Sequence, residues 1–302
     1  MRGMSRRTLE LIAFARKLLK ANHPMTLRQL HYAIFSAAEI DYKNNKADYQ
    51  RLSRATSESR RLYRFAQLKL RTNVVDAIPG NWIVDQTREA ETVSMWDDAA
   101  EYLETIKRSY RRDYWQIQPR YCEVWSEKGT VLASIRPIVR KLGVTVRVCH
   151  GFGSTGMESQ IGDLFEGIAK PITVFYLGDH DPSGHEIERD IYQRAECASG
   201  RKFSLVRLAI HAEDIRRFKL PPQVIKSSDS RAKGFERRFG KKAATVELDA
   251  LPVEELRRRV GDAIERLIDR DLWDRQVAVE KVELASIADF ANTVKNLPQL
   301  MR

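Results

Sequence analysis

The stretch that decides the fold is Ile-Thr-Val-Phe-Tyr-Leu-Gly-Asp-His-Asp-Pro-Ser-Gly, residues 172–184. Its first six residues form a β-branched and aromatic run, which is typical of a buried strand, and Pro-Ser-Gly is turn chemistry. Asp179 and Asp181 therefore follow the C-terminal end of a strand, where open α/β sheets bind their ligands. Two carboxylates one residue apart can chelate Mg²⁺, although many surface turns carry the same short pattern.

A second strand end also carries an acidic residue. Residues 120–127 read Arg-Tyr-Cys-Glu-Val-Trp-Ser-Glu, end in Glu127, and are followed by a helical pattern. Between residues 120 and 209 the order is strand, helix, strand, loop, helix, strand, helix, strand. This alternation predicts an α/β fold (α+β over the whole chain) with a mostly parallel sheet flanked by helices. Glu127 then lies at the same edge of the sheet as Asp179 and Asp181.

These motifs resemble the Toprim domain, with Glu127-Lys128 at the end of a first strand and Gly-Asp-x-Asp-Pro-x-Gly at the end of a later one. Within that family the likeness is to the topoisomerase VI A subunit and the meiotic double-strand-break transesterase, over roughly residues 120–250. The resemblance implies that Glu127, Asp179 and Asp181 bind Mg²⁺, with Mn²⁺ as a substitute, at a site of DNA strand scission. It also implies a homodimer.

The positive charge of the chain is concentrated near its N-terminus. The 302 residues have a formal net charge of +11, and the first 78 contain sixteen lysines and arginines against six acidic residues. A basic segment of this kind is typical of a protein that binds a polyanion, and double-stranded DNA is the obvious partner. A basic face that only contacts solvent is the alternative.

Cysteine usage and hydropathy indicate a cytoplasmic protein. Cys122, Cys149 and Cys197 show neither paired spacing nor an even count, so we expect reduced, buried thiols. No stretch is long and apolar enough for a signal peptide or a membrane span. We therefore expect no membrane partner, and the resemblance to the topoisomerase VI A family implies a nucleoid-associated, phage-encoded or plasmid-encoded protein.

The basic quarter predicts three helices followed by a β-hairpin. Residues 6–20 have apolar positions at helical spacing, Thr26 and Gln29 fit a capping box, and residues 47–65 predict a basic third helix. Residues 78–84 read as a turn leading into a strand. The order predicts a winged helix-turn-helix module of the CAP-like kind. The candidate DNA-binding residues are Arg51, Arg54, Arg60, Arg61, Arg64 and Lys128.

The second predicted helix carries Arg28 and Tyr32 one turn apart. At about 100° per residue Tyr32 lies roughly 140° from Leu27 on the packed face, so we expect Tyr32 and Arg28 to share an exposed face. A phenol can attack a phosphodiester, and a guanidinium can hold the phosphate and lower the phenol's pKa. The segment resembles the Arg-Asp-aromatic-aromatic-Tyr run of the topoisomerase VI A family, from which Gln29 and His31 depart. The resemblance implies that Tyr32 is the nucleophile; a surface tyrosine that packs on DNA or on the neighbouring domain is the alternative.

The chain is expected to form a winged-helix domain (1–90), a connecting helix (91–118) and a Toprim domain with C-terminal helices (119–302). Residues 247–251 alternate acidic and apolar types like a strand. Glu247 and Asp249 are therefore candidates to support the metal ligands or to hold a second ion, with an ordinary surface strand as the alternative. His180 is a candidate hydrogen-bonding or phosphate-facing residue because Mg²⁺ prefers oxygen. The basic stretch 226–242 looks like a mobile loop.

Three functions remain open. The first is Mg²⁺-dependent DNA cleavage by tyrosyl transesterification, with Tyr32, Arg28 and Glu127 as catalytic residues and a 5′-phosphotyrosyl intermediate. Topoisomerase (isomerase) activity would need a separate ATPase subunit, so the chain resembles a stand-alone protein of the mini-A type. The second is a Toprim nuclease that uses water as the nucleophile, like the overcoming-lysogenization-defect family. The third is a DNA-binding subunit without catalysis.

Overall fold

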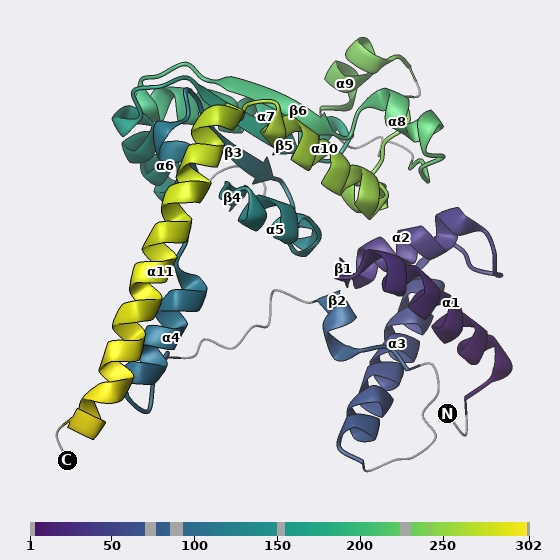
Figure 1. Ribbon diagram of the computed structural model, residues 1–302. Coiled ribbons are helices and arrows are strands. Elements are labelled where there is room, and N and C mark those ends of the chain that lie inside the picture. The colour runs from purple at the N-terminus through teal and green to yellow at the C-terminus, as the bar shows by residue number, and fades with distance from the viewer. Residues whose placement is uncertain are drawn as a thin grey trace.

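The structure is a computed structural model and describes residues 4–69, 77–84, 93–149, 155–223, 231–241 and 243–300. Figure 1 shows a helical N-terminal lobe, a second lobe built on a parallel sheet, and an arm of two helices that projects from the sheet lobe. The arm consists of α4 (Ala99–Ser109) and α11 (Arg270–Leu300). A parallel sheet with many helices confirms the predicted α/β class.

The N-terminal lobe contains the three predicted helices. They are α1 (Arg6–Asn22), α2 (Leu27–Ala37) and α3 (Lys46–Gln67). Leu11, Leu30 and Leu52, one from each helix, are fully buried in a common core. Thr26 and Gln29 form the predicted capping box, which satisfies backbone N–H groups at the start of α2. Local sequence signals therefore determine this lobe well.

The predicted wing differs from the structure in one respect. Strand β2 (Ile83–Val84) follows the 3₁₀ helix η1 (Gly80–Trp82), as expected for a turn leading into a strand. Within the described residues it pairs in parallel with β1 (Met25–Thr26), a contact that the sequence did not indicate. The return strand of a hairpin would begin in residues 85–92, which lie outside the described residues. The hairpin itself stays a prediction.

The second lobe is built on four parallel strands in the order β4-β3-β5-β6. The strands are β3 (Tyr121–Ser126), β4 (Thr145–Val148), β5 (Ile172–Leu177) and β6 (Ser204–Ala209). The helices between them are η4 (Gly129–Val131), α5 (Leu132–Lys141), α6 (Thr155–Gly167) and α7 (Pro182–Ser199). The predicted alternation of strands and helices from residue 120 to 209 is confirmed.

Helices cover both faces of this sheet. The face that carries Tyr176 packs against α6 and α7, and the face that carries Phe175 packs against α5 and α10 (Val253–Glu265). Burial on both faces explains why β5 reads as a continuous apolar run. Strands β3 and β5 end in register, with Ser126 opposite Leu177. The residues that follow these two strands therefore lie at one edge of the sheet.

The remaining elements correct several expectations. The helix expected over 91–118 is only α4, followed by η3 (Tyr114–Ile117), and α4 packs against α11. The strand expected over 247–251 is the 3₁₀ helix η5 (Leu248–Ala250). The basic stretch 226–242 contains α9 (Ala232–Phe239), although 226–230 and 242 lie outside the described residues. The short helix α8 (Ala212–Arg217) follows β6.

The two lobes contact one another through α2 and β1. Helix α2 lies against η5, and β1 lies against α5. Ser134 Oγ donates a hydrogen bond to Gln29 Oε1 at 2.8 Å across this interface. Because Gln29 also belongs to the capping box, the residue that starts α2 also docks it on the sheet lobe.

Two properties of the whole chain were also expected from the sequence. Among the described residues, no helix combines the length and the apolar character needed to cross a membrane. All three cysteines are free thiols. Cys122 and Cys149 are buried as predicted, whereas Cys197 is exposed on α7, so the expectation of burial is wrong for this residue. Because a thiol is small and only weakly polar, it is tolerated at an exposed position on the outer side of this helix.

Candidate metal centre

The ends of β3 and β5 bring Glu127 and Asp179 together. The Glu127 backbone N–H donates to the Leu177 carbonyl oxygen at 2.9 Å, which continues the strand pairing by one residue. The Asp179 backbone N–H in turn donates to Glu127 Oε2 at 3.0 Å. Asp179 is only 6% exposed. The predicted convergence of these carboxylates at one sheet edge is therefore confirmed.

The Asp-Pro-Ser-Gly turn starts α7. Asp181 is the N-cap, and its Oδ1 accepts a hydrogen bond from the Gly184 N–H at 2.6 Å. A Cβ at Gly184 would lie 2.5 Å from the Asp179 carbonyl oxygen and 3.1 Å from Glu127 Oε2, so only glycine fits there. Proline at the first helical position suits the fixed φ of a helix start. The positive end of α7 consequently faces the carboxylates.

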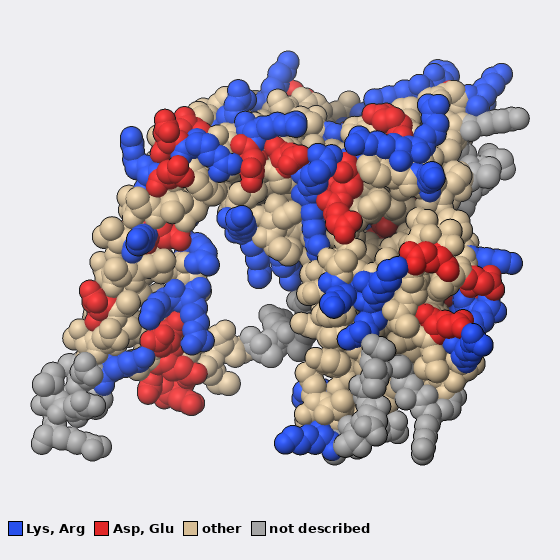
Figure 2. All heavy atoms as spheres, turned by 45° about the vertical axis from the view of Figure 1, so that its right-hand side comes forward, with Lys and Arg blue, Asp and Glu red and all other residues tan. Residues whose placement is uncertain are grey.

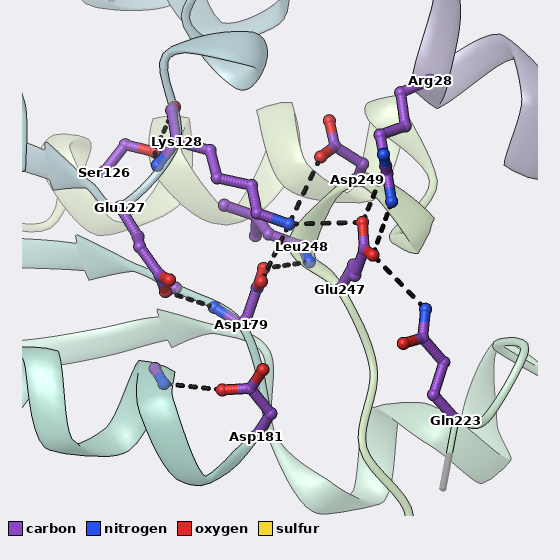
Figure 3. Close-up of polar contacts among 12 residues, drawn as sticks. Arg28, Ser126, Glu127, Lys128, Asp179, Asp181, Gln223, Glu247, Leu248 and Asp249 are labelled. Atoms are coloured by element: carbon purple, nitrogen blue, oxygen red, sulfur yellow. Dashed lines mark hydrogen bonds and ion pairs between the residues drawn. The ribbon is translucent and has the colours of Figure 1, made fainter. Parts of the chain in front are cut away.

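Figure 3 shows that acidic and basic side chains from four parts of the chain gather at this edge. They are Arg28, Glu127, Lys128, Asp179, Asp181, Glu247 and Asp249. Five carboxylates and two cations thus share this edge of the sheet lobe. Burial, together with the charges of Asp179 and Asp181, raises the pKa of Glu127 to about 7. Burial likewise raises the pKa of Asp179, although Lys128 opposes this. The site carries more negative charge than its own cations offset.

Lys128 points into this cluster. Its Nζ lies 2.8 Å from Asp179 Oδ2, 3.4 Å from Glu247 Oε2 and 3.6 Å from Asp249 Oδ2. Burial lowers the pKa of Lys128, but the charges of these three carboxylates outweigh burial and raise it, so the side chain is an ammonium. The sequence had suggested Lys128 as a DNA contact. In this structure it contacts carboxylates instead.

Glu247 and Asp249 reach the cluster from a distant part of the chain. They flank Leu248, whose backbone N–H donates to Asp179 Oδ1 at 2.7 Å. The preceding residue, Val246, forms a bridge with His180, which anchors this segment beside the Asp179 loop. Both acids thus lie close to Asp179, although a 3₁₀ helix and not the expected strand places them there.

Arg28 connects α2 to the same cluster. Its Nε and Nη2 donate to Glu247 Oε2 and Oε1 at 2.7 and 2.6 Å, a bidentate ion pair between the two lobes. Burial opposes ionisation of Glu247, but Lys128 and Arg28 outweigh it and hold the pKa of Glu247 below its usual value. The helix that carries Tyr32 is therefore attached to the candidate metal centre.

Tyr32 is not on an exposed face. Its exposure is 3%, and it packs in the apolar core of the sheet lobe with Leu248. Burial, followed by the charge of Glu247, raises the pKa of the Tyr32 phenol, while Arg28 and Lys128 act in the opposite direction. The expected exposure is wrong because the face opposite the core of α2 is covered by the second lobe. Periodicity within α2 cannot report that contact.

His180 turns to an aromatic cluster beside the loop. Its Nδ1 lies 3.0 Å from His185 Nε2, and Phe235 and Phe239 of α9 pack against both imidazoles. Burial, followed by the charge of Arg207, lowers the pKa of His180 to about 4 and that of His185 to about 3. Both rings are therefore neutral near pH 7. Their contacts support the loop rather than reach for a phosphate.

Lowering the pH from about 6.5 to about 4.5 is expected to destabilise the wild type more than a His180→Gln/His185→Gln variant. The unfolded chain takes up protons near pH 6.5, while the folded histidines stay neutral until about pH 4 and 3, so the free energy of unfolding falls with pH. Glu127 contributes the opposite slope in both proteins, because its raised pKa makes the folded state bind the proton first. Urea unfolding at several pH values measures the difference, and parallel profiles would contradict it.

The candidate DNA-binding arginines of α3 fall into two groups. Arg51 pairs with Asp48 at 3.1 Å, and Arg60 donates to the Ile83 carbonyl oxygen at 3.4 Å, so these two support the lobe. Three others are exposed: Arg54, Arg61 and Arg64. Figure 2 shows basic side chains interspersed with acidic ones on the face it presents, so the positive charge does not form one continuous patch there.

The carboxylate oxygens of this centre are the kind of ligand that a hard divalent cation prefers. Their distances to the cation now present are those of an ammonium. Mg²⁺ binds carboxylate oxygens at about 2.1 Å, and the buried carboxylates of Glu127 and Asp179 are suitable ligands. Among the described residues, however, no three His, Cys, Asp or Glu side chains are already arranged as a metal ion needs. The Lys128 ammonium lies among the carboxylates of Asp179, Glu247 and Asp249, at N···O distances of 2.8 to 3.6 Å that are longer than metal–oxygen bonds. Metal binding therefore requires their contraction.

Comparisons with known proteins add no family assignment. The chain matches no protein-family model and no curated protein. The function must therefore be argued from the residues and their geometry.

Proposed function

We propose that this chain is an Mg²⁺-dependent enzyme that cleaves DNA by tyrosyl transesterification. The observation that carries the proposal is that Glu127, Asp179 and Asp181 gather at one sheet edge, and that Arg28, one turn from Tyr32, is bound to the same cluster. Nucleophile, supporting cation and acidic centre thus belong to one neighbourhood although they lie far apart in the sequence.

The roles of the residues follow from their chemistry. Glu127, Asp179 and Asp181 would hold Mg²⁺, which offsets charge on the reacting phosphate. The Tyr32 phenol oxygen forms a bond to phosphorus, the bond from phosphorus to the 3′ oxygen breaks, and the proton lost by the phenol balances the one gained by the 3′ hydroxyl. Arg28 binds the phosphate and stabilises the phenolate. The product carries a 5′-phosphotyrosyl bond.

This chemistry requires the lobes to separate. Tyr32 is buried and Arg28 is paired with Glu247, so neither can contact DNA while α2 lies on η5. The described state is then a closed form, and DNA binding opens it. By resemblance we further propose a homodimer in which the tyrosine of one protomer serves the metal centre of the other, and a separate ATPase subunit where topoisomerase activity is needed.

A second candidate is a nuclease in which water attacks the phosphodiester. Its specific support is the burial of Tyr32 and the raised pKa of its phenol, both of which oppose its use as a nucleophile in the closed form. The metal ligands have the same role in both candidates. Only the attacking group differs.

Incubation of the purified chain with supercoiled DNA and Mg²⁺ tests the proposal. Reactions are stopped with detergent and divided into samples with and without protease. Transesterification gives nicked or linear DNA whose 5′ ends carry protein until protease is added, whereas a nuclease gives free ends in both samples. DNA that is bound but never cut contradicts both candidates and favours a non-catalytic DNA-binding subunit.

Replacing Arg54, Arg61 and Arg64 together by alanine is expected to weaken DNA binding and to reduce its salt dependence. Each lost phosphate contact lowers the slope of log K against log salt by about 0.9, so three contacts would remove about 2 to 3 units. Fluorescence anisotropy between low and moderate salt measures the slope. A matched control replaces three exposed arginines outside the N-terminal lobe, Arg189, Arg194 and Arg270. Equal slopes for both triple variants would contradict a DNA surface on α3.

A further inference from the structure

Asp249 is buried with little to compensate its charge. Its side chain is 1% exposed, and neither carboxylate oxygen accepts a hydrogen bond of ordinary geometry from the described residues, although the Thr130 side chain lies close enough to act against the rise in its pKa. Its one ion-pair partner in that part of the chain is Lys128 Nζ, at 3.6 Å, which is longer than a hydrogen bond. Burial raises the pKa of Asp249. Burying an ionised carboxylate in this position costs free energy unless a cation or a hydrogen-bond donor compensates its charge.

The oxygens of Asp179 and Glu247 point to the same place as those of Asp249. Figure 3 shows the three side chains around the Lys128 ammonium, with Asp179 and Glu247 oxygens at 2.8 and 3.4 Å from Nζ. Only the contact with Asp179 has the length of a strong hydrogen bond. Lys128 balances the charge of Asp179 and Arg28 balances that of Glu247, so Asp249 is the carboxylate of the three whose charge is least compensated.

We propose that Asp179, Glu247 and Asp249 form a second cation site, occupied in the closed form by the Lys128 ammonium and in the active form by a hard divalent cation. Oxygen ligands without nitrogen or sulfur select Mg²⁺ or Mn²⁺. The double positive charge of such an ion would balance the site better than one ammonium does.

Exchange of the two cations is physically simple. Lysine is a point charge on a flexible four-carbon stem, so Nζ can leave the carboxylates without moving its backbone. An incoming DNA phosphate would attract it, and the vacated carboxylates could then contract around the divalent ion. Substrate binding and completion of the metal centre are thereby coupled. The inference rests on the proposed function in taking Asp179 as a metal ligand and DNA as the substrate.

Counting bound Mn²⁺ by electron paramagnetic resonance tests the site without DNA or catalysis. The full chain is titrated at pH 7.5 as wild type, Lys128→Met, and Lys128→Met/Asp249→Asn. We expect Lys128→Met to bind one Mn²⁺ more than the wild type, and Asp249→Asn to remove this additional ion. A Lys128→Met stoichiometry equal to that of the wild type overturns the inference, as does an additional ion that survives Asp249→Asn.

If Lys128→Met folds poorly, the change in Tm on adding Mn²⁺ provides a second measurement. Lys128→Gln is the second variant, because its amide can still hydrogen-bond to the carboxylates. Either variant is expected to gain more in Tm from Mn²⁺ than the wild type does, and Asp249→Asn is expected to reduce that gain. Equal gains in all proteins overturn the inference. If the wild type binds no Mn²⁺ while Lys128→Met binds one ion that depends on Asp249, the proposed metal centre at Glu127 fails and this second site stands.

Discussion

Asp179→Asn is expected to reduce Mg²⁺-dependent DNA cleavage by roughly 10²- to 10³-fold while the protein stays folded. Asp179 contacts three parts of the centre, since its backbone N–H donates to Glu127, its Oδ1 accepts from the Leu248 N–H and its Oδ2 pairs with Lys128. Asparagine has the same shape and keeps an oxygen for Leu248, but it loses the negative charge that a divalent cation needs. Cleavage of supercoiled DNA at fixed Mg²⁺ measures the loss.

A matched control is Asp262→Asn on α10. Asp262 is exposed and pairs with Arg258 at 2.8 Å, so its replacement removes one carboxylate at a distance from the centre and should leave cleavage unchanged. Circular dichroism melting of both variants separates loss of chemistry from loss of fold. Cleavage by Asp179→Asn at the wild-type rate would contradict a metal centre on this carboxylate.

The sheet and its acidic edge could be predicted because their signals are local. A buried parallel strand reads as a continuous apolar run, and the residue after it must lie at the carboxyl edge of the sheet. The positions of Glu127 and Asp179 at this edge could be predicted from these local signals alone. Glu247 and Asp249 were also nominated, but from an alternation that suggested a strand. The bridge between His180 and Val246 places them, and no sequence pattern reports it.

What the sequence could not report depends on contacts between distant elements. Tyr32 is buried because η5 covers the outer face of α2, and the amphipathic pattern of α2 describes only its own core. Lys128 turns inward because three carboxylates compensate its burial, whereas an isolated lysine in a sequence is read as a surface residue. The arm of α4 and α11 likewise depends on a helix pair separated by more than a hundred residues.

Tyr32→Phe is expected to abolish the formation of protein-linked DNA ends, with a fall of about 10³-fold or more if the phenol is the nucleophile. Phenylalanine preserves the aromatic packing in the apolar core and loses the interaction of the phenol with Arg28, so the free energy of unfolding should fall by only about 1 kcal/mol. DNA binding should also be retained, since the exposed arginines of α3 are unchanged. The measurement is the protease-dependent mobility of the cleaved DNA, with Tyr102→Phe on the exposed face of α4 as the control.

The burial of Tyr32 makes this experiment informative in both directions. If the phenol has to leave the lobe interface before it reacts, the wild type should cleave DNA slowly. Tyr32→Phe should not cleave DNA at all, although its candidate metal ligands are unchanged. If Tyr32→Phe cuts DNA at the wild-type rate and leaves free ends, water is the nucleophile. Arg28 and Tyr32 would then serve to hold α2 on η5, through the ion pair with Glu247 and the packing against Leu248, and the transesterase proposal would be wrong.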